Sequence, residues 1–318
     1  MNNLLANLSY YIPELIAVAT MMALLFMEAT YRKSTGRKFV FISGYIGLFC
    51  CLIASFLNLG VYKPLFTNAV IIDPFSTWIK IVMILGTLVS AHLAKISREI
   101  PLNLKTEFFI LSTGVLIGGM LLASANNMLT VYLGVETLSI LSYVMASLRK
   151  NDEKSSEAGL KYVLYGGVSA AVMLFGIGHI YGVLGSIHFF EMSSKLTQLS
   201  SMEIYVLLPA FLLFFAGLGY KIACVPFHMW SPDVYEGSPT PVSMFFSIVP
   251  KVAGIAALVR VSYLFFNQEG ILQTSWVGLL QVVAAITMTL GNISAIGQRS
   301  VKRMLAWSSI SHIGVILL

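Results

Sequence analysis

The sequence predicts an all-α polytopic membrane protein with about ten transmembrane helices. Of the 318 residues, 57% are hydrophobic and only 11% are Asp, Glu, Lys or Arg, whereas a soluble domain carries about 25% charged residues. The charged residues lie between apolar stretches of about 18 residues or more, a length that crosses a bilayer as a helix. This composition excludes soluble enzymes, nucleic-acid-binding domains and disulfide scaffolds, and it makes the lipid bilayer an expected partner.

The apolar runs place the expected helices in order along the chain. Each run is long enough to span a bilayer and is bounded by polar residues. The expected spans cover residues 11–30, 39–60, 74–95, 107–125, 127–148, 158–184, 204–230, 239–266, 274–296 and 301–318. Residues 186–202 are too polar for a span and predict a loop with a short interfacial helix.

The Lys and Arg residues predict the orientation of these helices. They gather in alternate loops, at residues 31–38, 95–105, 149–154 and 299–303, whereas the intervening loops hold only Lys63 and Lys195. Cytoplasmic loops of membrane proteins carry the excess of Lys and Arg. We therefore expect these basic loops in the cytoplasm and the N-terminus on the outer side.

Five basic residues remain inside the expected spans: Lys80, Lys161, Lys221, Lys251 and Arg260. A Lys or Arg at mid-membrane costs roughly 2.5–3.5 kcal/mol on insertion scales, so it usually faces a partner or a wet cavity. Lys80 and Arg260 lie near outer helix ends, where a long side chain can reach the interface, and we expect them to do so. Lys221 and Lys251 lie too deep for this, and the position of Lys161 is ambiguous.

One carboxylate is expected at a comparable depth: Glu136, in the span 127–148. Burial disfavours the charged form of a side chain, and an opposite charge nearby favours it. A buried Glu among buried Lys residues therefore indicates charge pairing. Two interpretations stay open at this point: a static ion pair that orients helices, and a proton relay.

Helix-breaking residues favour the relay. Pro226 follows Lys221 by five residues, and Pro250 immediately precedes Lys251. Pro removes a backbone hydrogen bond, and broken helices beside buried ionisable residues are typical of transport sites. His228, which can exchange protons near neutral pH, lies between Lys221 and a cytoplasmic loop. The alternative for each proline is a packing kink.

The sequence holds no pattern of a cofactor site. Cys50, Cys51 and Cys224 lie in apolar segments without metal-ligand spacing. We find no phosphate-binding loop, haem-ligand pair or cysteine cluster for iron and sulfur. We therefore expect no catalytic residue, cofactor or metal ion on this chain.

One segment carries a family resemblance. GYKIACVPFHMWSPDVYEGSPTPV, residues 219–242, resembles the signature of the N subunits of bacterial NADH:quinone oxidoreductases, respiratory complex I. Residues 134–167, with GVETLSILSYVMASL and AGLKYVLYGG, and residues 291–314, GNISAIGQRSVKRMLAWSSISHIG, support it. The wider family includes the other antiporter-like subunits of complex I, Mrp-type cation/proton antiporters and membrane-bound hydrogenases.

The resemblance implies proton-transfer roles for five residues. In this family an acidic residue of the fifth helix pairs with a lysine of a broken seventh helix, which implies Glu136 and Lys221. The lysine that opens the sixth helix corresponds to Lys161, and the central lysine of the eighth helix to Lys251. The histidine of the PFHMW segment corresponds to His228.

The resemblance also implies an antiporter-like inverted-repeat fold. Family members typically have about fourteen helices with two inverted five-helix repeats. On that pattern, residues 1–105 form an N-terminal three-helix segment, residues 106–270 the complete first repeat, and residues 271–318 the start of an incomplete second repeat. We therefore expect the chain to be C-terminally truncated, without the ionisable residue of the twelfth helix. Trp307 departs from the pattern, because relatives often have Tyr at this position.

These implications define a functional hypothesis. The chain is expected to be a proton-translocating subunit of NADH:quinone oxidoreductase in a bacterial inner membrane, with other membrane-arm subunits as partners. Protons would enter near His228, load Lys221 and pass to Lys251, with Glu136 controlling the charge on Lys221. NADH, FMN, iron–sulfur clusters and quinone are expected on other subunits. The alternatives are an Mrp-type cation/proton antiporter subunit and a structural membrane-arm subunit that does not pump.

Overall fold

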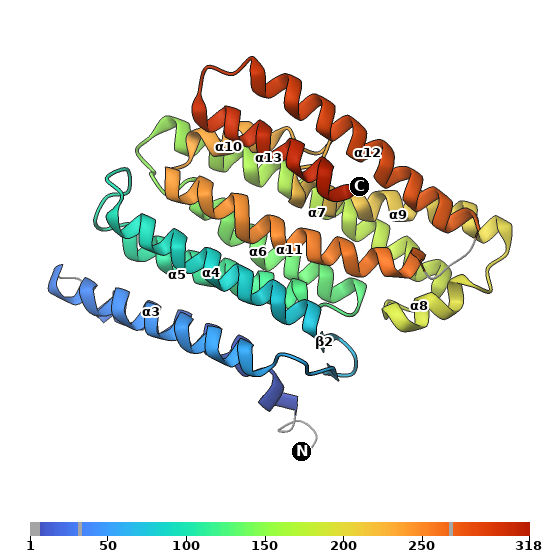
Figure 1. Cartoon of the computed structure of the whole chain (residues 1–318), viewed down its shortest axis with the longest axis horizontal. Coiled ribbons are helices and arrows are strands. Elements are labelled where there is room, and N and C mark those ends of the chain that lie inside the picture. The colour runs from blue at the N-terminus through green and yellow to red at the C-terminus, as the bar shows by residue number, and fades with distance from the viewer. Residues whose placement is uncertain (1–6, 31–33, 267–269) are drawn as a thin grey trace.

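The protein is a bundle of helices that lie side by side with nearly parallel or antiparallel axes (Figure 1). The computed structural model describes residues 7–30, 34–266 and 270–318. Residues 31–33, part of the basic segment 31–38 used to predict the orientation, lie outside the described residues. The elements are α2 (Ile12–Thr30), α3 (Ser34–Leu57), β1 (Lys63–Leu65), β2 (Val70–Ile72), α4 (Pro74–Ile96), α5 (Lys105–Ala123), α6 (Met128–Ala146), α7 (Glu153–Leu184), α8 (Phe189–Leu196), α9 (Ser201–Ile222), α10 (Trp230–Gly237), α11 (Thr240–Phe266), α12 (Ile271–Ile296) and α13 (Val301–Leu317).

The prediction of an all-α polytopic membrane protein is confirmed. In the described part of the chain, nine helices are long and apolar enough to cross a membrane: α2, α3, α4, α5, α6, α7, α9, α11 and α12. The tenth expected span corresponds to α13, which has 17 residues. The short helix expected within residues 186–202 corresponds to α8, which has 8 residues.

Two parts of the structure differ from the expected spans. The loop after α3 contains an antiparallel hairpin, in which Lys63 pairs with Ile72 and Leu65 with Val70. The expected span 204–230 is wrong at its C-terminal part, because α9 ends at Ile222. The next residue, Ala223, has a left-handed backbone with φ of 61°, which ends the right-handed helix. The chain becomes helical again only at α10.

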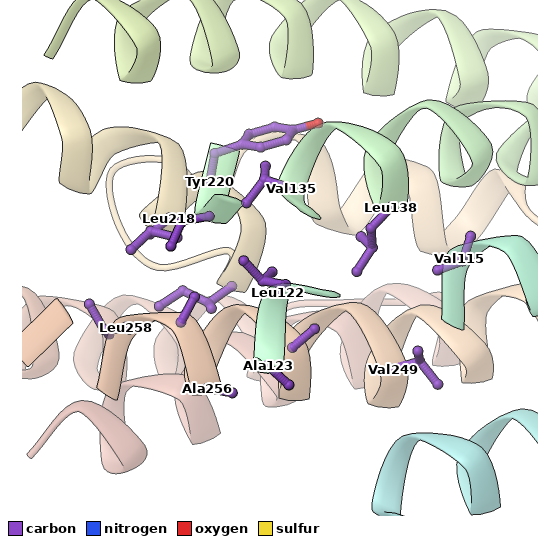
Figure 2. Close-up of a cluster of buried hydrophobic side chains, with 14 of the residues drawn as sticks. Val115, Leu122, Ala123, Val135, Leu138, Leu218, Tyr220, Val249, Ala256 and Leu258 are labelled. Carbon is purple, nitrogen blue, oxygen red and sulfur yellow. The ribbon is translucent and has the colours of Figure 1, made fainter. Parts of the chain in front are cut away.

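The core lies where α5, α6, α9 and α11 meet. Figure 2 shows side chains of these four helices gathered between the ribbons, among them Val115 of α5, Leu138 of α6, Leu218 of α9 and Val249 of α11. The helices α5 and α6 pack closely because Gly118 has no side chain, and a Cβ at this position would lie 2.6 Å from the backbone nitrogen of Leu138. Small residues allow such close packing of membrane helices. This packing fixes the helices that carry the buried charges.

The expectation that Lys80 reaches the membrane interface is wrong, whereas Arg260 reaches Asp73, the residue that caps the N-terminal end of α4. Lys80 Nζ on α4 lies 2.5 Å from Glu14 Oε1 on α2, and the two side chains are only 3% and 2% exposed. Arg260 Nη2 on α11 lies 2.7 Å from Asp73 Oδ1. In both cases an acidic residue on another segment of the bundle is within reach. Each long side chain therefore ends in an ion pair with another segment of the bundle.

The buried pair of Glu14 and Lys80 leads to a stability prediction. Lys80→Met is expected to destabilise the fold by roughly 3–5 kcal/mol, because it leaves a buried carboxylate without its partner. The double variant Glu14→Gln with Lys80→Met removes both charges and should recover most of this loss. Thermal unfolding in detergent measures the effect, with Lys150→Met in an exposed loop as the control. Equal unfolding temperatures of Lys80→Met and Lys150→Met would contradict the prediction.

Candidate functional site

Lys221 lies in the last turn of α9, and its side chain is only 1% exposed. Its Nζ donates a hydrogen bond to Ser139 Oγ on α6 at 3.0 Å and lies 5.8 Å from the centre of the Tyr162 ring on α7. The aliphatic part of the side chain packs on α11, where a Cβ at Gly254 would lie 3.4 Å from Lys221 Cγ. Lys221 therefore contacts α6, α7 and α11 next to the end of its own helix.

The backbone groups freed by the break after Lys221 find new partners. The Tyr220 carbonyl accepts hydrogen bonds from the Trp230 indole at 3.0 Å and from the Ala223 N–H at 3.1 Å. The Val225 N–H donates to Thr287 Oγ1 on α12 at 3.1 Å. An unsatisfied backbone group in a bilayer costs several kcal/mol. These bonds therefore allow a non-helical segment at this depth.

Lys251 is the second buried lysine of the site. It follows Pro250 within α11, which remains helical through the proline, and its side chain is 3% exposed. Its Nζ donates a hydrogen bond to Ser309 Oγ on α13 at 2.6 Å and lies 5.6 Å from the centre of the Tyr235 ring on α10. Lys251 thus links α11 to α10 and α13.

Aromatic side chains fill the space between the two lysines. Tyr162, whose ring faces Lys221, stacks on Trp230 with ring centres 4.3 Å apart and an interplanar angle of 11°. Trp230 lies 6.5 Å from Tyr235, whose ring faces Lys251. The Tyr162 and Tyr235 hydroxyls are buried and make no hydrogen bond within the described residues. Sequence reasoning missed these three residues, which were visible only as part of the family-like segments.

Glu136 does not pair directly with Lys221 in this conformation. Within the described residues, no ion pair of 4.0 Å or less joins the two side chains. Glu136 is half-buried on α6, and its Oε1 has no hydrogen-bond partner among the described residues. Lys221 binds Ser139 instead, which lies three residues further on the same face of α6. The expected partner is thus about one helical turn from the group that Lys221 contacts.

His228 is in the non-helical segment between α9 and α10, seven residues after Lys221. Its side chain is only 4% exposed, and its ring centre lies 5.2 Å from that of Trp307 on α13. The following residue, Met229, is 61% exposed. His228 therefore lies just beneath the surface, on the chain segment that leads to Lys221.

Lys161 is not part of the buried group. Its side chain is 36% exposed and forms ion pairs with Glu157 at 2.7 Å and Asp233 at 2.6 Å. Asp233 also forms an ion pair with Arg303, whose Nη1 lies 2.7 Å from Asp233 Oδ1. Asp233 therefore ties α10 to both α7 and α13. Sequence reasoning did not single out Asp233, since nothing in its local pattern predicts that two basic residues from other helices meet there.

The loop between α4 and α5 fixes the start of α11. Glu99 accepts hydrogen bonds from the Thr240 N–H at 2.6 Å and the Thr240 hydroxyl at 2.7 Å. Lys302 Nζ lies 3.4 Å from the same carboxylate. Burial alone would raise the pKa of Glu99, but the hydrogen bonds from Thr240 and the charge of Lys302 hold the pKa below its usual value. The carboxylate is therefore charged at neutral pH and caps the helix that carries Lys251.

Two pockets border the site. One, of about 620 Å³, reaches Lys251 and extends from Lys302 to His312 between α11 and α13. The other, of about 570 Å³, lies along α7 and α9 and is lined by Lys161 and Pro226. Within the described residues, no group of three or more His, Cys, Asp or Glu side chains is arranged to hold a metal ion.

Together these features define a class of protein: a helical membrane protein with ionisable side chains buried beside a broken helix, an arrangement typical of ion and proton transporters. A family model described as "NADH:quinone oxidoreductase/Mrp antiporter, TM" matches residues 125–318. The chain belongs to this family.

Two similar proteins are both named as subunit N of NADH-quinone oxidoreductase. The chain is 35% identical to "NADH-quinone oxidoreductase subunit N" of Anaeromyxobacter sp. (strain Fw109-5), over 97% of this chain and 63% of that protein. It is 37% identical to "NADH-quinone oxidoreductase subunit N 2" of Sorangium cellulosum (strain So ce56), over 98% of this chain and 65% of that protein. The chain thus spans just under two thirds of the length of these relatives.

Solved structures share the fold. A chain of respiratory complex I from Thermus thermophilus with bound aureothin has a TM-score of 0.78 and 30% identity, covering 95% of this chain and 62% of that chain. A chain of the archaeal membrane-bound sulfane sulfur reductase has a TM-score of 0.84 at 22% identity, covering 97% and 64%. A chain of the Mrp complex from Dietzia sp. DQ12-45-1b has a TM-score of 0.82 at 20% identity, covering 98% of this chain and 58% of that chain. The last two show the fold alone, and the expected antiporter-like fold is confirmed.

Proposed function

We propose that the chain is a proton-translocating membrane-arm subunit of an NADH:quinone oxidoreductase in a bacterial inner membrane. The observation that carries the proposal is the pair of buried lysines. Lys221 lies at a helix break, Lys251 lies beside Pro250, and aromatic side chains with buried hydroxyls fill the space between them. The similarity to relatives named as subunit N of NADH-quinone oxidoreductase supports the proposal that the two lysines act within such a complex.

We propose that the two lysines exchange protons through the polar groups between them. The stem of Lys221 packs on Gly254, which is three residues from Lys251 on α11, a rise of about 4.5 Å along the helix axis. The Tyr162 and Tyr235 hydroxyls offer donors and acceptors along this route. We propose that a proton enters near His228, is held on Lys221 and moves to Lys251.

Glu136 is proposed to control the charge on Lys221. A buried ammonium is costly unless a partner compensates it. In the described conformation that partner is the Ser139 hydroxyl, which is neutral. A shift of α6 by about one turn would replace this hydroxyl with the Glu136 carboxylate. Approach of Glu136 would thus load the lysine, and its withdrawal would release the proton.

Lys161 contributes through its contact with α10. Its ion pair with Asp233 positions the helix that carries Tyr235, whose ring faces Lys251. We therefore propose that Lys161 couples the position of α7 to the route between the lysines.

The work of translocation must come from outside this chain. Moving one charge against 100 mV costs about 2.3 kcal/mol. We propose that quinone reduction supplies this work, with NADH, FMN, iron–sulfur clusters and quinone bound by other subunits. The basic residues near Glu99 and Asp233 gather at one end of the bundle. Cytoplasmic loops carry the excess of Lys and Arg, which supports the proposal that this end faces the cytoplasm and the N-terminus lies outside.

Co-purification tests this assignment. The native protein is extracted from membranes in mild detergent, and each fraction is assayed for NADH:quinone reductase activity, with and without sodium. The proposal predicts that the chain migrates in a large complex with NADH:quinone activity that does not depend on sodium. A sodium-dependent proton exchange without NADH activity would contradict it and support an Mrp-type antiporter subunit.

A further inference from the structure

A pocket of about 620 Å³ lies at the end of the bundle that carries the hairpin and α8, opposite the end with Glu99 and Asp233. Figure 1 shows β2 and α8 at this end of the molecule. The pocket is bordered by the hairpin, the start of α4, the loop between α5 and α6, α8 and the last turns of α11. It therefore lies at the level where the helices end, which is the headgroup region of a bilayer.

The floor of the pocket holds the ion pair of Arg260 and Asp73. Arg260 donates Nε–H to the Ala123 carbonyl and Nη2–H to Asp73 Oδ1, both at 2.7 Å. Asp73 Oδ1 also accepts the Ser76 N–H at 2.8 Å. The hydrogen bonds of this ion pair use Nε and Nη2 of Arg260 and Oδ1 of Asp73. Burial opposes the charge on Asp73, but Arg260 and Ser76 hold the pKa of this carboxyl below its usual value.

The rim of the pocket is aromatic. Tyr62 is 72% exposed, Phe190 84% and Tyr263 61%, and they come from three different segments. Exposed aromatic rings at helix ends sit at the membrane interface, with the ring toward the acyl chains. A free inorganic anion would make no use of these rings, whereas a molecule with a polar head and an apolar tail would use both the rim and the floor.

We propose that this pocket binds the headgroup of a phospholipid that carries a primary amine. The phosphate binds Arg260, whose planar guanidinium matches phosphate geometry. The ammonium binds the second oxygen of Asp73. The glycerol and the first part of the acyl chains lie against Phe190 and Tyr263. The site is independent of the proton route, and it binds α11 to α4 and α8 at the end of the bundle away from the cytoplasm.

The test measures lipid retention by the purified full chain, or by the complex that contains it. The protein is delipidated in detergent and titrated with phosphatidylethanolamine, phosphatidylglycerol or inorganic phosphate, and bound lipid is counted by native mass spectrometry. We expect one phosphatidylethanolamine per chain. We also expect phosphatidylglycerol to bind about tenfold more weakly, which corresponds to the loss of one charged contact.

Variants separate binding at this pocket from general lipid adhesion. The rim variant Phe190→Ala with Tyr263→Ala leaves the ion pair intact. It is expected to weaken the binding of phosphatidylethanolamine about tenfold. Tyr205→Ala, an exposed aromatic on α9 outside the pocket, is the matched control and should have no effect. Equal retention of both lipids, no effect of the rim variant, or saturation by inorganic phosphate alone would each overturn the proposal.

Discussion

The variant Lys221→Met is expected to lose proton transfer through this chain. Met retains an unbranched apolar stem that can pack on Gly254, but its thioether cannot hold a proton. Loss of a positioned proton-transfer group typically costs about 10²-fold or more in rate, so we expect proton transfer through this chain to fall by at least about 10²-fold and total acidification to fall by the share that this chain carries. The measurement is NADH-driven acidification of sealed vesicles that contain the assembled complex, with Lys150→Met in an exposed loop as the control.

A second substitution separates a proton carrier from a structural charge. Lys221→Arg keeps a positive charge beside Ser139 and Tyr162, but a guanidinium does not give up its proton in proteins. The account predicts an assembled complex without translocation through this chain. Normal acidification in Lys221→Met vesicles would contradict the carrier role and support a structural subunit.

Glu136→Gln is expected to lower proton translocation through this chain by about tenfold, which equals a loss of ~1.4 kcal/mol in stabilisation of charged Lys221. Gln keeps the shape of the side chain and removes the charge that is proposed to load the lysine. The same vesicle assay measures the effect. Glu153→Gln, at the exposed start of α7, is the matched control.

Ser139 makes the test of Glu136 specific. Lys221 donates its hydrogen bond to Ser139 in the described conformation, so Ser139→Ala should affect that conformation without removing the trigger. If Glu136→Gln leaves quinone-linked pumping unchanged while Ser139→Ala abolishes it, the carboxylate does not control Lys221.

Membrane thickness explains why the helices could be predicted from the sequence. Each span must supply about 20 apolar residues, and this constraint is readable from composition alone. A break near Lys221 was predicted from Pro226 and from the resemblance, and it is confirmed. Its position after Ile222 could not be predicted from apolar length, because the residues that follow, ACVPFHMW, continue the apolar run. The hairpin at Lys63–Ile72 was also missed, since three-residue strands leave little periodic signal.

Long-range partners account for the other differences. Glu14 and Lys80 are 66 positions apart, and no local pattern shows that α2 places a carboxylate against α4. Lys161 has the same explanation: the resemblance grouped it with the buried lysines, but α10 brings Asp233 to it at the exposed end of α7. Contacts made by tertiary packing determine whether a charged side chain is buried, paired or exposed.

The chemistry of the candidate site could be predicted only in part. Lys221 and Lys251 were found from their depth and from neighbouring prolines, because a buried charge requires an explanation. Their hydrogen-bond partners, Ser139 and Ser309, were not found. Ser in a membrane helix usually bonds to its own helix backbone, so its residue type alone does not mark it as a partner of a lysine.

The ratio of protons translocated to NADH oxidised tests the central claim most directly. It is measured in sealed vesicles that contain the assembled complex, for the native protein and for the double variant Lys221→Met with Lys251→Met. The account predicts a lower ratio in the double variant, because the route through this chain has no group to hold the proton. An unchanged ratio, with normal assembly and NADH oxidation, would contradict the account.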